Sequence, residues 1–147
     1  MNEAMQMIGC LLASALFALL FRTPVRLIAP ASVTAVMGYA LSVWAGRELN
    51  AEWAGIFLGS LAAALVGEML ATRLRAPATI FLTVAVIPLV PGAGLYNTML
   101  ALVQGRSADA AAAGSSTILA AGGIALGLSI AASAAYAIRR TRKGRIP

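Results

Sequence analysis

Five long apolar segments, separated by short polar connections, dominate the pattern of this chain. They cover residues 4–21, 27–45, 53–72, 78–103 and 115–138. A helix needs roughly 20 residues to cross a hydrocarbon core of about 30 Å, and the five segments fit that length. The pattern therefore predicts an all-α integral membrane protein, a single domain over residues 1–147 with five transmembrane helices.

The fourth segment carries two prolines and two glycines, Pro88, Pro91, Gly92 and Gly94, inside its apolar run. Proline lacks a backbone N–H and blocks the carbonyl four residues earlier, while glycine adopts conformations that other residues avoid. The segment is also longer than one crossing requires. We therefore predict a broken fourth helix, with half-helices at about 78–86 and 94–103 and the break near residues 88–94.

The break is the candidate substrate site. The second half-helix would point unbonded N–H groups and its positive dipole end into the break, where a carboxylate could bind. Polar side chains in its first turn add donors. The candidate substrate-binding residues are Pro88, Pro91, Gly92, Gly94, Tyr96, Asn97 and Thr98. In the alternative interpretation, the prolines merely kink a helix and the polar side chains bond to neighbouring residues.

Composition narrows the class of protein. The chain is 61% hydrophobic and 11% charged, with a mean hydropathy of +0.88, which excludes a soluble core. The net charge of +6 comes from residues at the ends of apolar runs, a distribution that does not favour nucleic acid. Cys10 is the single cysteine and histidine is absent. We therefore expect no metal site, no cofactor and no enzymatic activity.

The distribution of basic residues predicts the orientation. Every Lys and Arg except Arg47 and Arg106 lies at 22–26, at 73–77 or in the tail at 139–147. Basic residues favour the cytoplasmic side, so we expect a cytoplasmic C-terminus and an external N-terminus. This arrangement needs five crossings, so the fourth segment must cross, and its break is expected near the middle of the membrane. The basic tail is expected to contact anionic lipid.

Small residues recur every four positions in the third segment, and a glycine pair occurs in the fifth. Such spacing gives a helix a face on which another helix can pack closely. The candidate packing residues are Gly55, Gly59, Ala63, Gly67, Gly123 and Gly127.

Glu68 is the single acidic residue inside a predicted span. Ionisable groups in membranes are costly and often mark proton pathways, so Glu68 is a candidate for proton coupling. Its position near the predicted cytoplasmic end leaves another interpretation open. There it could reach the interface or pair with Arg73 or Arg75.

The stretch IPLVPGAGLYNTML at residues 87–100 resembles the threonine/serine exporter family. The likeness extends to FRTPVR at residues 21–26 and to NAEWAGIFLGS at residues 50–60. Within this family, the chain resembles the small C-terminal half, which some bacteria encode as a separate subunit. The resemblance implies a multi-pass protein of the bacterial inner (cytoplasmic) membrane that works with a larger membrane subunit. It also implies a small carboxylate substrate, threonine or serine, or a dicarboxylate such as succinate.

The sequence thus predicts one subunit of a heteromeric, proton-coupled exporter of small carboxylates. Two alternatives stay open. The chain could be a structural or assembly subunit without a solute site, or a self-sufficient homo-oligomeric channel or carrier.

Overall fold

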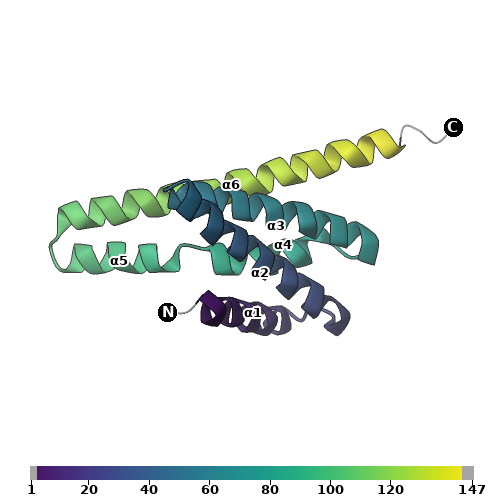
Figure 1. The fold of residues 1–147 in the computed structure, drawn as a ribbon, viewed down its shortest axis with the longest axis horizontal. Helices are drawn as coiled ribbons and strands as arrows, with labels where there is room; N and C mark the ends of the chain where they lie inside the picture. The colour runs from purple at the N-terminus through teal and green to yellow at the C-terminus, as the bar shows by residue number, and fades with distance from the viewer. Residues whose placement is uncertain (1–2, 144–147) are drawn as a thin grey trace.

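The computed structural model describes residues 3–143, with side chains for residues 4–138 and for Arg140, and these residues form an elongated helical bundle (Figure 1). Its elements are α1 (Glu3–Leu20), α2 (Val25–Glu48), α3 (Glu52–Leu74), α4 (Ala78–Val86), the 3₁₀ turn η1 (Ile87–Leu89), α5 (Gly92–Val103) and α6 (Ser107–Lys143). The described part contains no strand, so the predicted all-helical class is confirmed. Part of the predicted basic tail, residues 144–147, lies outside the described residues.

Three helices are long and apolar enough to cross a membrane, namely α2, α3 and α6 over Ser107–Ile138. The pair Ala78–Leu89 and Gly92–Val103 is bent by 46° and makes a fourth candidate if it is taken as one span. The first helix is shorter, with its apolar part at Ala4–Leu20. The count of five crossings and the orientation of the termini stay predictions.

Helix α3 lies at the centre and packs against α2, α4 and α6. Its small residues face these neighbours. A β-carbon at Gly59 would lie 2.5 Å from the carbonyl oxygen of Gly38 in α2, and one at Gly55 would collide with the carbonyl oxygen of Ser42. The two backbones therefore approach closely because no side chain stands between them.

The other predicted packing residues lie in similar contacts. Ala63 contacts Gly38 of α2, and Gly67 lies against Phe81 of α4. On α6, a β-carbon at Gly123 would lie 3.0 Å from the carbonyl oxygen of Trp53, and one at Gly127 would collide with the hydroxyl of Ser60. The small residues of α3 and α6 thus hold α3 against three different helices.

Helix α6 begins at Ser107 instead of Ser115. The pattern of apolar residues predicts a connection over residues 104–114. Alanine has the highest intrinsic helix propensity, however, so the run from Ala110 to Ala113 extends the helix. Arg106 and Asp109 form an exposed 2.9 Å ion pair beside its first turn. The connection between α5 and α6 is therefore a tight turn.

The break lies near one end of the bundle, not at its middle. Leu89, directly before the break, packs in one buried cluster with Ile56 of α3 and with Ala120 and Ile124 of α6. Ile56 is in the second turn of α3, so the break is level with the connection between α2 and α3. Figure 1 shows α5 and the first part of α6 projecting past that connection. The break therefore lies beside the α2–α3 connection in the bundle, and its position near mid-membrane stays a prediction.

Candidate functional site

The helical path is interrupted at Val90 and Pro91. Val90 is extended, with φ −61° and ψ 128°, and Pro91 follows with φ −76° and ψ 60°. The ring of a proline disfavours helical geometry in the residue before it, which explains the conformation of Val90. Pro88, by contrast, sits in the 3₁₀ turn, where its missing N–H costs little. Of the two prolines, Pro91 therefore causes the break.

Helix α5 starts without a side-chain cap. Pro91 occupies the N-cap position, and its carbonyl accepts a hydrogen bond from the amide of Leu95 at 3.1 Å. The amide of Gly92 donates to the Val90 carbonyl at 2.8 Å. The amides of Ala93 and Gly94 fall in the first turn, where no carbonyl of the same helix can reach them. This end of α5 therefore carries hydrogen-bond donors and the positive end of a helix dipole.

A cavity of about 980 Å³ lies between the break, the α2–α3 connection and α6. This volume is at the upper end of the range for small-molecule sites. Its wall combines residues from four helices and the break: Tyr39, Ser42, Val43, Gly46 and Arg47 from α2; Asn50 and Ala51; Glu52, Trp53 and Ile56 from α3; residues 88–94 and Asn97; and Ala113, Ser116, Thr117, Leu119 and Ala120 from α6.

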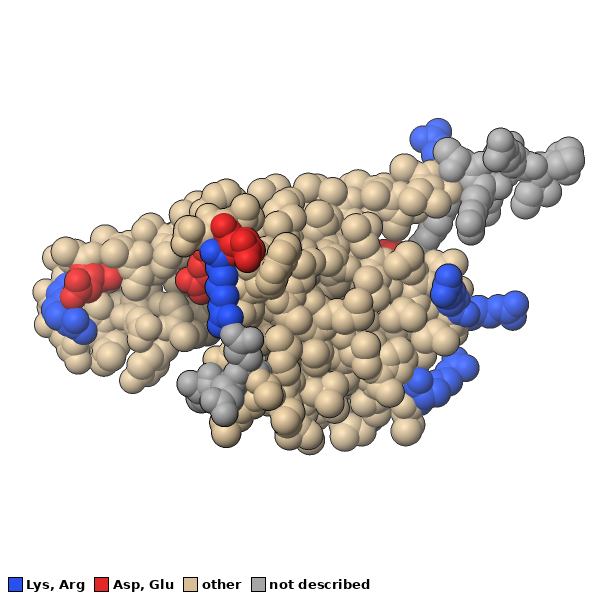
Figure 2. Space-filling view, viewed as in Figure 1, with Lys and Arg blue, Asp and Glu red and all other residues tan. Residues whose placement is uncertain are grey.

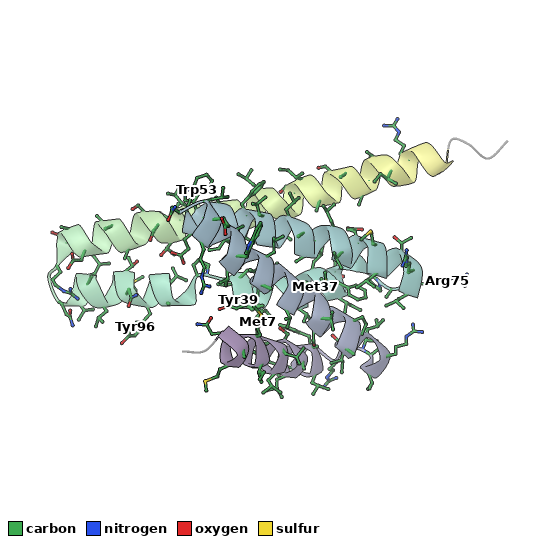
Figure 3. The ribbon with its side chains drawn as sticks, in the orientation of Figure 1. Met7, Met37, Tyr39, Trp53, Arg75 and Tyr96 are labelled. Carbon is green, nitrogen blue, oxygen red and sulfur yellow. The ribbon has the colours of Figure 1, made fainter. Side chains whose placement is uncertain are left out.

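Five of the candidate substrate-binding residues line this cavity, namely Pro88, Pro91, Gly92, Gly94 and Asn97. Tyr96 and Thr98 do not. Tyr96 is exposed and points outward from α5, as Figure 3 shows. The Thr98 hydroxyl donates a 2.7 Å hydrogen bond to the Gly94 carbonyl, and its methyl group lies against Gly114 of α6. Of Tyr96, Asn97 and Thr98, Asn97 alone lines the cavity.

Gly94 serves the close contact between α5 and α6. A β-carbon at this position would collide with the hydroxyl of Thr117, which is buried and donates to the Ala113 carbonyl at 2.7 Å. Gly92 has open space around it. Both glycines lie inside a regular helix. Their role is therefore not the unusual backbone conformation that the sequence suggested.

Glu68 lies in a separate groove. This groove has a volume of about 320 Å³ and is formed by Leu65, Glu68, Met69, Thr72 and Arg73 of α3 with Ala135 and Ile138 of α6. At ~1.5 Å rise per residue, Glu68 is about 18 Å along α3 from Ile56, at the cavity. The structure therefore does not bring Glu68 together with the break.

The α2–α3 connection forms a part of the cavity wall that the sequence pattern does not predict. Arg47, Asn50, Glu52 and Trp53 all line the cavity, and Figure 2 shows acidic and basic side chains gathered near this connection. In the sequence these residues have the mixed charge and flanking indoles of a solvated interfacial turn. Their link to the break arises only when Leu89 packs on Ile56. The sequence feature that could have indicated a site here is the mixed charge next to a tryptophan.

A family model described as "Threonine/Serine exporter, ThrE" matches residues 6–134. No match was found among curated proteins or among solved structures. The matched region includes most of α1, all of α2 to α5, the break, both walls of the cavity and most of α6. This extent agrees with the resemblance carried by the proline and glycine motif. The chain therefore belongs to the threonine/serine exporter family.

Proposed function

We propose that this chain is the small membrane subunit of a bacterial inner-membrane exporter for small carboxylates, and that the cavity binds the solute. Family membership supports the exporter role. The observation that supports a solute site is the cavity itself, which is lined by the uncapped start of α5, by Arg47 and by Asn97. Helix N-termini and arginine both favour carboxylate groups.

The exposed apolar surface of α5 supports the proposal that a larger partner subunit binds there. Leu95, Met99, Leu102 and Val103 are each at least half exposed, while α5 packs mainly on α6. Large apolar side chains gathered on one helix favour burial against lipid or protein. We propose that a larger membrane subunit covers α5 and completes the wall of the cavity. If a second copy of the chain covered α5 instead, the protein would be the homo-oligomeric carrier.

Replacing the Asn97 side chain tests the solute site. In cells that contain the whole exporter, we expect Asn97→Ala to reduce efflux of preloaded radiolabelled threonine or succinate by about threefold to tenfold, the effect of one lost hydrogen bond. Tyr96→Ala is the matched control, because Tyr96 is next in the chain and lies outside the cavity wall. Equal efflux from the two variants, at equal amounts of protein, would refute the assignment of the cavity.

Proton coupling through Glu68 has its own test. If Glu68 carries the coupled proton, Glu68→Gln should flatten the dependence of efflux on external pH, because an amide cannot exchange a proton. The readout is the efflux rate across a series of external pH values, with Glu48→Gln as a carboxylate control on α2. A profile unchanged from the wild type would remove Glu68 from the proton pathway.

The assembly-subunit alternative predicts a different outcome. In that case the partner contains the whole pathway, so cavity variants such as Asn97→Ala leave efflux unchanged while the complex still forms. Mass spectrometry of what co-purifies with the tagged chain in mild detergent identifies a partner directly. Purified chain that transports alone in vesicles would favour the homo-oligomer.

A further inference from the structure

The cavity contains one cationic and one anionic side chain. Among its described lining residues, Arg47 is the single cation and Glu52 the single carboxylate. Arg47 ends α2 and Glu52 begins α3, so the short connection presents both to the same space. A ligand with one charge of each sign complements this wall, whereas a ligand with two negative charges meets a repelling carboxylate.

The cationic side of the cavity is suited to a carboxylate. The free amides of Ala93 and Gly94 and the guanidinium of Arg47 all border the cavity. Asn97, one turn further into α5, also lines the cavity. These groups together can hold one carboxylate of a solute.

The anionic side is suited to an ammonium group. Within the part of the chain that the structure describes, Glu52 forms no hydrogen bond or ion pair. The exposed indole of Trp53 follows it and lines the same cavity. A carboxylate favours a small cation by charge pairing, and an exposed indole that lines the same cavity can add cation–π attraction.

We propose that Glu52 determines substrate specificity by pairing with the ammonium group of an α-amino acid, so that the cavity accepts a zwitterion in preference to a dicarboxylate. This inference rests on the proposed function and deepens it by choosing between the two solute classes. Glu52 also has a helix-stabilising position in the first turn of α3, so the test must separate recognition from folding.

The test compares two carboxylates on the same connection. In cells with the whole exporter, we expect Glu52→Gln to reduce threonine efflux by about tenfold, the typical effect of losing a charged hydrogen bond. Succinate efflux should not fall, because the lost group repels it. Glu48→Gln is the control, since Glu48 is exposed but does not line the cavity. Glu52→Asp, which keeps the charge, should recover most threonine efflux.

A binding measurement provides a second readout. Trp44→Phe leaves Trp53 as the single indole of this chain, so the part of the fluorescence change in the purified complex that a further Trp53→Phe substitution removes reports on the cavity. We expect a saturable change with threonine, and a loss of that change in Glu52→Gln.

The other outcomes distinguish failure of this inference from failure of the proposed function. If Glu52→Gln and Glu48→Gln affect threonine and succinate alike, the inference is wrong and the proposed function stands. If the wild type exports neither solute, the proposed function is wrong and the inference falls with it. Succinate preferred over threonine by the wild type would also overturn the inference.

Discussion

Gly59→Ala should destabilise the folded chain by about 2–3 kcal/mol, although the same substitution stabilises most helices. The added β-carbon would lie 2.5 Å from the carbonyl oxygen of Gly38 and 2.6 Å from the β-carbon of Ser42. The first of these atoms is backbone, so the clash can be relieved only by moving α2 away from α3. Overpacked interiors typically lose about 1–3 kcal/mol, and the contact between two backbones places Gly59 at the upper end.

Gly122→Ala is the matched control for this prediction. Gly122 lies in the middle of α6 with no atom near enough to meet a β-carbon, so alanine should stabilise it by about 0.5–1 kcal/mol. Unfolding of the purified chains in mild detergent, with increasing denaturing detergent, measures both changes. Shifts of the same sign for the two variants would contradict the close contact between α2 and α3.

Much of the fold could be predicted from local pattern. The apolar runs indicated where the helices lie, and the four-residue spacing from Gly55 to Gly67 indicated a face for close packing. The start of α6 was misplaced because hydropathy measures membrane preference, whereas alanine promotes helix in any surroundings. A helix that continues beyond its apolar part, as α6 does at Ser107, is invisible to hydropathy.

One part of the candidate site could be predicted from the sequence and the other could not. The break at Pro91 follows from proline chemistry, and its position is readable in the chain. The opposite wall of the cavity cannot be read from the sequence. Glu52 lies near the break because Leu89 packs on Ile56, and these two residues are distant in sequence. Helix crossing decides which turn of α3 meets the end of α4. The residues that face the break across the cavity therefore cannot be read from the order of residues alone.

Gly94→Ala should reduce efflux by about tenfold while leaving the central bundle folded. Its β-carbon would collide with the Thr117 hydroxyl, and α5, which packs mainly on α6, can relieve the clash by moving outward. Strain of about 1–3 kcal/mol is typical of such overpacking. That movement displaces the free amides at the start of α5 from the opposite wall at Glu52 and Trp53.

A second substitution should reverse this loss. Thr117→Ala removes the hydroxyl, and the Thr117 β-carbon would lie 3.4 Å from the new methyl group, within ordinary contact. The double variant should therefore regain most of the efflux measured for the wild type. Gly92→Ala controls for stiffening of α5, because Gly92 also lines the cavity but has open space around it. If Gly92→Ala loses as much efflux as Gly94→Ala, or if Thr117→Ala fails to restore it, the spacing between α5 and α6 does not control transport.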